Sequence, residues 1–267
     1  MGDYKTVKFM IRDGILLAFQ LLTTIPIRKE VPWDNERAQW SVAAYPLTGL
    51  MLGLLLAIQA YVLLSYTSLS LMIITAWLLT FSIVYSGGLH LDGWADFSDA
   101  VFSRREREKK LEIMKDSRIG AFGVLSLLVL LGWRYLFMYE AILLLGDNIV
   151  FVLLTIPFLT RLFMGFQILF GRFAREHGMA RALLPAKCPF VKRLYALWVM
   201  LFIGCTVIWQ PLMLALLLAG FLFFIVWLQF CNKQIGGVTG DTIGASTEGG
   251  ETWLWLVLLL LLAFVTG

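Results

Sequence analysis

Apolar runs long enough to cross a lipid bilayer recur along almost the whole 267-residue chain. A transmembrane helix needs roughly 20 consecutive apolar residues, and 60% of the residues here are hydrophobic while only 15% are charged. Soluble domains carry charge on about a quarter of their residues. The sequence therefore predicts an all-α, polytopic integral membrane helical bundle. No polar segment is longer than about 30 residues, so we expect a single integral membrane domain covering residues 1–267.

The lysines and arginines fall into separate segments, and their distribution predicts the topology. Of the 22, three precede residue 13, three lie in residues 28–37, seven in 104–118, six in 172–193, and one is Lys233. Only Arg134 and Arg161 fall inside apolar runs, and the connections "YTSLS", "GDN" and "WQP" contain no lysine or arginine. Basic connections face the cytoplasm. Because basic and non-basic connections alternate, each apolar run between them is expected to cross the membrane.

This alternation predicts about seven spans. They are residues 42–65, 69–86, 119–145, 149–170, 195–209, 212–231 and 252–266. The stretch "GILLAFQLLTTIPI", residues 14–27, has basic residues on both sides and is too short for a crossing, so we expect an interfacial or re-entrant helix. The polar segments 87–118, 171–194 and 232–251 then lie on the cytoplasmic face, where we expect the active site.

Three aspartates follow the second of these spans, in the stretch "GGLHLDGWADFSDA". Asp92, Asp96 and Asp99 are spaced i, i+4, i+7, which places them within about 60° on one face of a helix. The glycine pair before them favours a break between the span and this helix. A solvated helix face is the weaker interpretation, because none of the three has a basic partner at i+4. Grouped carboxylates suit Mg²⁺, especially where phosphates complete its coordination.

A second segment, "GGVTGDTIGASTEGGE", repeats this spacing. Asp241 follows its glycine pair as Asp92 follows the first pair. Glu248 comes seven residues later, as Asp99 does, and Glu251 lies one turn further on. The repeat is either a coincidence in a glycine-rich loop, or it predicts two half-sites that face each other with one or two metal ions between them. The additional glycines of the second copy predict that part of it is irregular backbone rather than helix.

Basic residues of the polar segments are candidates for binding phosphate groups. Lys115 and Arg118 stand just before an apolar run, and the arginine suits two-pronged contact with phosphate. Arg172 and Arg175 come from another cytoplasmic segment, and contact with lipid headgroups is the alternative for all of these residues. Arg161 differs, because an ionisable side chain in mid-span is costly and usually functional. We expect it to reach the cytoplasmic cavity or to pair with a carboxylate.

Three more ionisable residues lie at or within the apolar runs. His90, two residues before Asp92, is a candidate metal ligand or base, although a histidine at a helix entrance often only satisfies backbone groups. Arg134 and Glu140 are six residues apart in one span and do not stack on one helix face. We therefore expect no site role for either, with Glu140 reaching outward to the interface.

The motifs together resemble those of the cobalamin synthase family, whose members are also called adenosylcobinamide-GDP ribazoletransferases or cobalamin-5'-phosphate synthases. The similar stretches are "GGLHLDGWADFSDA", "LEIMKDSRIGAFG" and "GGVTGDTIGASTEGGE", with "YPLTGLMLG" beginning at Tyr45 and "RFAREHGMA" beginning at Arg172. They cover nearly the whole chain and occur in the same order. The combination is specific, although each short motif alone is weak.

The resemblance implies an enzyme that joins adenosylcobinamide-GDP to α-ribazole or its 5'-phosphate and releases GMP, in the last steps of cobalamin biosynthesis. It implies Mg²⁺ as the cofactor and a site facing the cytoplasm in the inner membrane. By position, the functional acids are Asp92, Asp96, Asp99 and Asp241, with Glu248 and Glu251 beside them as further metal ligands. The expected partners are the two substrates and the lipid bilayer, with no nucleic acid. A homo-oligomer, or a complex with other cobalamin-assembly enzymes, is compatible with this.

The residues agree with such a reaction. Cleaving a pyrophosphate while a sugar hydroxyl attacks requires that negative charge on the transferring and leaving phosphates be neutralised. We expect metal held by the aspartates to bridge those oxygens. Basic residues would hold the rest, and the candidates are Lys115, Arg118, Arg161, Arg172 and Arg175. The general base would be a carboxylate near the attacking hydroxyl, or His90, and Asp99 is the expected one by position.

Two other function classes fit less well. CDP-alcohol phosphotransferases also use clustered aspartates on membrane helices, but in the pattern D-x-x-D-G-x-x-A-R. Here Leu89 stands where the first aspartate of that pattern should be. An ion transporter with broken helices is the other alternative. Its acidic site would lie near the bilayer midplane, whereas these acids are expected at the cytoplasmic ends of spans.

Overall fold

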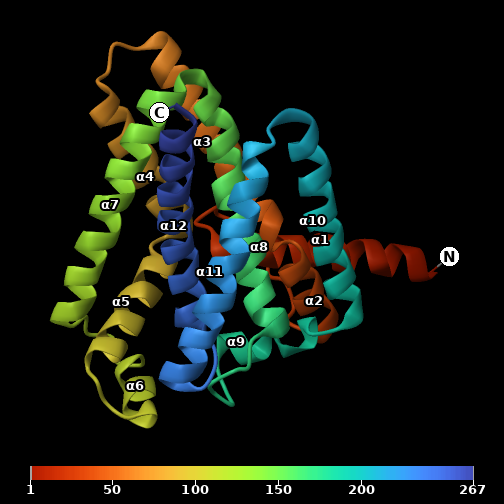
Figure 1. Cartoon of the computed structure of the whole chain (residues 1–267). Helices are drawn as coiled ribbons and strands as arrows, with labels where there is room; N and C mark the ends of the chain where they lie inside the picture. The colour runs from red at the N-terminus through yellow and green to blue at the C-terminus, as the bar shows by residue number, and fades with distance from the viewer. Residues whose placement is uncertain (1, 267) are drawn as a thin grey trace.

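The structure is a computed structural model that describes residues 2–266, without the side chains of residues 2–8, 209, 265 and 266. The regular elements of these residues are all helices, and an isolated β-bridge joins Phe173 to Val238. The long helices gather into one elongated bundle (Figure 1). The predicted all-α membrane bundle is confirmed.

Long helices form the bundle, and short ones lie in its connections. The long helices are α1 (Gly2–Leu22), α3 (Tyr45–Tyr66), α4 (Leu71–Ser86), α5 (Leu89–Phe102), α7 (Ala121–Leu145), α8 (Ile149–Phe170), α10 (Pro189–Trp209), α11 (Leu212–Ile235) and α12 (Gly240–Thr266). The short elements are α2 (Asn35–Ala43), α6 (Arg107–Ile113), η1 (Gly146–Asn148), α9 (Met179–Ala182) and η2 (Leu184–Ala186). In Figure 1, α6 and α9 lie at the opposite end of the bundle from the turn between α7 and α8.

The described residues contain five helical stretches that are long and apolar enough to cross a membrane. They are Asn35–Tyr66, Ala121–Phe170, Pro189–Ile208, Leu212–Ile235 and Gly240–Phe264, and a sixth is added if α4 and α5 together count as one bent span. The expected count of about seven is therefore not confirmed. One reason is that α4 has 16 residues and reaches only about 24 Å, short of a hydrocarbon core of about 30 Å. Another is that α7 and α8 lie within the single apolar stretch Ala121–Phe170, although the short element η1 separates them and they run in opposite directions (Figure 1).

The closest helix packing joins α3 to α8. A Cβ atom added to Gly53 would lie 2.7 Å from the carbonyl oxygen of Leu153, and one added to Gly49 would overlap the backbone of Pro157. Small residues four apart let two membrane helices approach to backbone contact, where dispersion forces are strongest. This contact fixes α8 at the centre of the bundle, and most of its side chains are buried.

The N-terminal helix α1 lies across the direction of the long helices at the side of the bundle (Figure 1). It is not among the helices that qualify as spans. Its buried Asp13 pairs with Lys29, in the connection after α1, and with Arg37 on α2. Hydrogen bonding from Lys29 holds the pKa of Asp13 below its ordinary value. These ion pairs tie α1 to the segment that leads into α3.

The glycine pair between α4 and α5 produces a sharp bend, as the sequence predicts. Gly87 and Gly88 have φ values of 63° and 74°, a left-handed conformation that side chains disfavour. The axes of α4 and α5 differ in direction by 87°. The bend turns α5 away from the span that precedes it and toward the beginning of α12.

The second glycine-rich segment is irregular only over residues 236–239, whereas its later glycines, from Gly240 to Gly250, lie in a regular helix instead of the irregular backbone that they predict. Helix α12 runs without interruption from Gly240 to Thr266. Glycine is unfavourable inside a helix by about 1 kcal/mol relative to alanine, but here it allows close packing. A Cβ atom on Gly249 would lie 2.7 Å from the Trp94 ring, and one on Gly244 would lie 3.2 Å from the Cα of His90. The glycines therefore serve the contact between α12 and α5.

Candidate active site at the junction of α5 and α12

The two acidic segments meet where α5 packs against the first turn of α12. A Cβ atom added to Gly93 would lie 2.5 Å from the carbonyl oxygen of Asp241. Since no side chain fits in that space, a glycine is required for the two backbones to touch. The contact brings Asp92, which precedes Gly93 on α5, close to Asp241 on α12. The two repeated segments face each other, as their spacing predicts.

The aspartates at this junction interact through their charges. Asp96, which is half-buried, interacts electrostatically with Asp92, Asp241 and Asp99. Asp92 is exposed. Within the described part of the chain, neither Asp92 nor Asp96 has a hydrogen bond or ion pair to its carboxylate. Neighbouring like charges repel one another, so a junction whose carboxylate oxygens have no cationic protein partner at Asp92 or Asp96 favours a bound cation.

Asp241 is held in place by a loop that follows α8. Val238 donates its backbone N–H to the carbonyl oxygen of Arg172 at 2.7 Å, and Ala174 donates to Val238 at 2.9 Å. This short pairing brings the Arg175 guanidinium within 3.5 Å of the Asp241 carboxylate. Arg175 is thus the predicted phosphate-binding residue that the structure brings to the aspartates.

Asp99 has a different environment, although it belongs to the same helix face. One carboxylate oxygen accepts the backbone N–H of Gly120 at 2.7 Å and the other accepts that of Gly123 at 2.8 Å. These groups lie in the first turn of α7, where backbone N–H groups have no partner within the helix. Asp99 therefore caps α7 from a neighbouring helix, and both of its oxygens are engaged.

Glu248 and Glu251 lie in a buried ion network instead of among the aspartates. Arg134 on α7 donates to Glu248 Oε2 at 2.7 Å and to Glu251 Oε2 at 3.2 Å, and Arg161 on α8 donates to Glu251 Oε1. All four residues are at most 6% exposed. Glu248 lies seven residues beyond Asp241, about 10 Å along the helix. The structure does not bring the two glutamates to the aspartate cluster.

The sequence predicts no site role for Arg134, because that prediction compares it only with Glu140 on the same helix. Its partners come from α12: besides the two glutamates, Nη2 donates to the carbonyl oxygen of Glu248 at 2.6 Å and Nε donates to Thr252 at 3.0 Å. The sequence does contain an indication of these pairs, because the two arginines inside apolar runs equal in number the two acids that precede the last apolar run. For Arg161, the predicted pairing with a carboxylate is confirmed.

His90 borders this ion network and is 1% exposed. Its Nδ1 lies 3.9 Å from Glu248 Oε1, and no described residue gives either ring nitrogen a hydrogen bond. The interpretation that it satisfies backbone groups is therefore not supported. Because His90 and Asp92 are two residues apart on a helix, their side chains diverge by about 200°. The histidine faces α12, whereas Asp92 is exposed.

The remaining predicted phosphate ligands are exposed. Arg118 pairs with Asp116 at 2.6 Å, and hydrogen bonds from its side chain and backbone lower the pKa of Asp116 to about 2. Among the residues described, no hydrogen bond or ion pair joins the side chain of Lys115, Arg118 or Arg172 to the aspartate cluster. The structure brings Arg175 to the site but not these three.

The carboxylate oxygens of the junction suit a magnesium ion that phosphate oxygens also bind. They do not form a complete coordination shell by themselves. Among the described residues, no three His, Cys, Asp or Glu side chains form a group that could hold a metal ion by themselves. Mg²⁺ usually keeps several waters and takes one or two carboxylates together with substrate phosphates. Asp92 and Asp96, with no hydrogen-bond partner for their carboxylates, and Asp241 beside them provide such oxygens. The residues present fit that cation.

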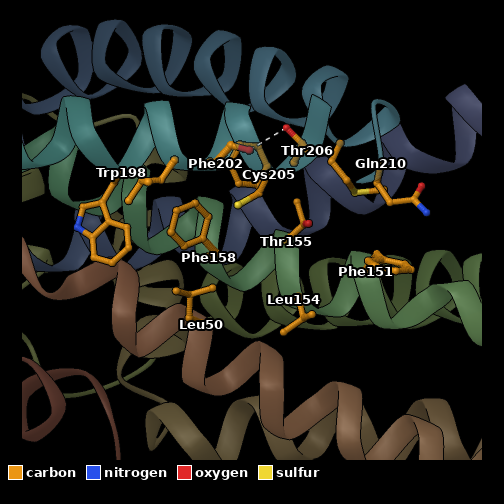
Figure 2. Close-up of a pocket in the computed structure, with 12 residues that line it drawn as sticks. Leu50, Phe151, Leu154, Thr155, Phe158, Trp198, Phe202, Cys205, Thr206 and Gln210 are labelled. Atoms are coloured by element: carbon orange, nitrogen blue, oxygen red, sulfur yellow. Dashed lines mark hydrogen bonds between the residues drawn. The ribbon is translucent and has the colours of Figure 1, made fainter. Parts of the chain in front are cut away.

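A separate groove of about 440 Å³ lies between α3, α8 and α10. Figure 2 shows that aromatic and aliphatic side chains such as Phe158, Phe202 and Leu154 line it. Thr155, Thr206 and Gln210 are polar, but no charged residue belongs to the lining. None of the predicted site residues contributes to this groove, so it lies outside the candidate active site.

Comparison with known proteins identifies the family. The sequence profile of the cobalamin-5-phosphate synthase family matches residues 14–259. Relatives named adenosylcobinamide-GDP ribazoletransferase are similar over their whole length. The one from Halalkalibacterium halodurans is 47% identical over 95% of this chain and 98% of its own. That from Geobacillus sp. (strain WCH70) is 39% identical over 95% and 97%, and that from Clostridium tetani is 30% identical over 93% and 97%.

No solved structure matches the chain. The family assignment therefore depends on sequence alone, and the profile covers α5, α7 and the part of α12 that holds the aspartates and the ion network. The identity of the relatives extends through the same segments. The chain belongs to the cobalamin-5-phosphate synthase family.

Proposed function

We propose that this protein joins adenosylcobinamide-GDP to α-ribazole, or to α-ribazole 5'-phosphate, and releases GMP in the last steps of cobalamin biosynthesis. Family membership and the names of the relatives support this activity. The observation that carries the proposal is the contact between Gly93 and Asp241, which joins the aspartates of both repeated segments at one site.

The reaction is a substitution at phosphorus. A ribose hydroxyl of the α-ribazole forms a new O–P bond to the phosphate attached to the cobinamide. The bond from that phosphorus to the bridging oxygen of the pyrophosphate breaks, and GMP leaves with the electron pair. The hydroxyl proton passes to a base, and negative charge increases on the leaving phosphate. A site for this reaction needs cationic groups at the pyrophosphate and a proton acceptor beside the hydroxyl.

Asp92, Asp96 and Asp241 would hold magnesium on the open side of the junction. When bound with the substrate, the ion neutralises charge on the phosphate oxygens. Arg175, which contacts Asp241, is positioned to donate hydrogen bonds to the same phosphates. The aspartates and Arg175 together would therefore orient the pyrophosphate across the contact between α5 and α12.

The proton acceptor must have an oxygen that is not already engaged. Asp99 accepts two backbone N–H groups from α7, which stabilise its charge and compete for its lone pairs. Asp92 and Asp96 have no such bonds among the described residues. We therefore assign the proton transfer to one of these two carboxylates, through an oxygen that does not hold the metal, in preference to Asp99.

The expected membrane location is part of the proposal. The loops that surround the aspartates carry most of the lysines and arginines, and such loops remain on the cytoplasmic side. The site would then face the cytoplasm from the inner membrane, where water-soluble substrates reach it. Association with a second copy, or with other enzymes of cobalamin assembly, is compatible with this placement.

The test is GMP release by the purified protein in detergent with magnesium, adenosylcobinamide-GDP and α-ribazole 5'-phosphate. We expect release by the wild type and a loss of at least about 100-fold in Asp92→Asn, the scale seen when one charge-stabilising group is removed. Asp116→Asn is the matched control, because Asp116 is an exposed aspartate that pairs with Arg118 instead of belonging to the aspartate junction.

Two results would overturn the proposal. One is the absence of GMP release from protein that is folded and pure. The other is full activity of Asp92→Asn, which would leave the aspartate junction without a role in the reaction. Ion flux through liposomes by protein that releases no GMP would favour the transporter alternative.

A further inference from the structure

Helix α6 is fastened to the end of α11 next to the candidate site. The Lys110 ammonium donates to Gln234 Oε1 at 2.6 Å. Three residues before Lys110, the guanidinium of Arg107 lies directly over Gly236, in the space that a Cβ atom would occupy. Gly236 follows the last residue of α11 with a φ of 75°. A glycine there allows the left-handed turn and also leaves room for the Arg107 guanidinium. Arg107 is therefore placed by the fold, although its helix is mostly solvated.

Arg107 and Arg175 reach across the same interface from opposite sides. Arg107 donates to the carbonyl oxygen of Ala174 at 3.5 Å, and Arg175 donates to the carbonyl oxygen of Leu111 on α6 at 3.1 Å. Each guanidinium thus contacts the segment that carries the other. This exchange links α6 to the loop that follows α8 and brings both arginines to the interface beside Asp241, which Arg175 contacts.

Most hydrogen-bond donors of the two arginines are free. A guanidinium has five N–H donors. Arg107 has the single long bond to Ala174 and no ion pair among the described residues. Arg175 has one bond to Leu111 and a long contact with Asp241, while its Nε is buried without any partner. The buried, unpartnered Nε of Arg175 indicates a place for an acceptor, and the exposed guanidinium of Arg107 is free to donate to the same anion.

The neighbouring charges specify the kind of anion. Arg175 contacts Asp241, whose cluster has carboxylates suited to a divalent cation. A ligand that spans both groups must offer oxygens to the arginines and to a cation at once, as a pyrophosphate does. We propose that Arg107 and Arg175 form the binding site for the pyrophosphate of the GDP-bearing substrate. Arg107 is then a substrate-binding residue in addition to those named above, and this inference rests on the proposed function.

The experiment measures binding of inorganic pyrophosphate to the purified full-length protein by calorimetry in magnesium buffer, and the KM for adenosylcobinamide-GDP. Arg107→Gln removes both the positive charge and the planar guanidinium donors, whereas Arg107→Lys retains the charge without those donors. Arg105→Gln is the matched control, because Arg105 is exposed on the same segment and its side chain has no hydrogen bond or ion pair with the described residues. It lowers the net charge by the same amount.

We expect Arg107→Gln to weaken pyrophosphate binding and raise the KM by about tenfold, the scale of one charged hydrogen bond. Arg107→Lys should recover part of this loss, and Arg105→Gln should change neither value by more than about twofold. Equal losses in Arg105→Gln and Arg107→Gln would show a diffuse charge effect and overturn the proposal. So would unchanged binding in Arg107→Gln.

The two proposals fail in different ways. If the wild type releases no GMP, the proposed function fails, while pyrophosphate binding by the four proteins still decides whether Arg107 belongs to an anion site. If the wild type is active and Arg107→Gln keeps the wild-type KM and pyrophosphate affinity, only the role of Arg107 is overturned.

Discussion

Gly93 on α5 and Asp241 on α12 touch through their backbones, and no side chain fits between them. The distance between the aspartates of the two repeated segments is therefore set by main-chain contact instead of by flexible side chains. A catalytic arrangement fixed in this way loses little conformational entropy when substrate binds. It is also sensitive to any added atom at the contact.

Gly93→Ala should separate α5 from α12 and lower the rate of GMP release by at least about tenfold. An added methyl group in a packed contact costs about 1–3 kcal/mol, and small displacements of catalytic groups reduce rates strongly. The measurement pairs the GMP assay with thermal unfolding in detergent. Gly132→Ala on α7 is the control, because a Cβ atom there meets nothing within 4 Å. Wild-type activity in Gly93→Ala would show that the contact does not set the geometry.

Asp99 can be tested as a helix cap and as a base with two substitutions. Asp99→Ala removes both acceptors for the first turn of α7 and should lower stability by about 1 kcal/mol, as other cap deletions do. Asp99→Asn keeps one acceptor oxygen but cannot take up the proton. If Asp99 acts only as a cap, Asp99→Asn retains activity within about tenfold. A loss of 100-fold or more in that variant, the scale of general-base catalysis, would restore Asp99 as the base.

The stability contributed by the buried ion network should depend on its arginines and its glutamates together. Arg134→Gln leaves Glu248 buried without its main partner, which costs about 3–5 kcal/mol. We expect a large fall in the unfolding temperature and a partial recovery when Glu248→Gln is added to the same chain. Glu140→Gln changes an exposed acid of the same helix and should stay within about 0.5 kcal/mol of the wild type. Additive effects in the double variant would argue against a direct pair.

Magnesium removal should stop the reaction without unfolding the protein. The glutamates, paired with arginines, stabilise the helix bundle, whereas the aspartates are expected to bind metal only with substrate. Excess chelator should therefore abolish GMP release and leave the unfolding temperature almost unchanged, and added Mg²⁺ should restore activity. Undiminished turnover in chelator would contradict the assignment of the cation to Asp92, Asp96 and Asp241.

Much of the fold could be predicted because bilayer crossing leaves strong patterns. The bend at Gly87 and Gly88 was predictable from the glycine pair, and the approach of Asp241 to Asp92 from the repeated spacing. The regular helix at the start of α12 was not, because glycine disfavours helix in isolation. Its stability there comes from contacts with α5, which lie far away in the sequence.

The roles of individual acids were harder to predict. Asp99 and Glu248 each follow an aspartate by seven residues, yet one caps α7 and the other pairs with Arg134. Spacing along one helix gives the face on which a side chain lies, but the partner comes from another helix. Arg107 illustrates the same limit, because a charged helix on its own predicts only contact with solvent.

The ion network also constrains the order in which the protein can be completed. Arg134 and Arg161 belong to α7 and α8, whereas both of their acidic partners are on α12, which the ribosome makes much later. Until α12 inserts, two guanidinium groups within apolar helices have no carboxylate to neutralise them, a costly condition in a bilayer. A nascent chain stopped before residue 240 therefore lacks both acidic partners of these two arginines. Insertion of α12 supplies both acidic partners and brings Asp241 to the junction in the same step.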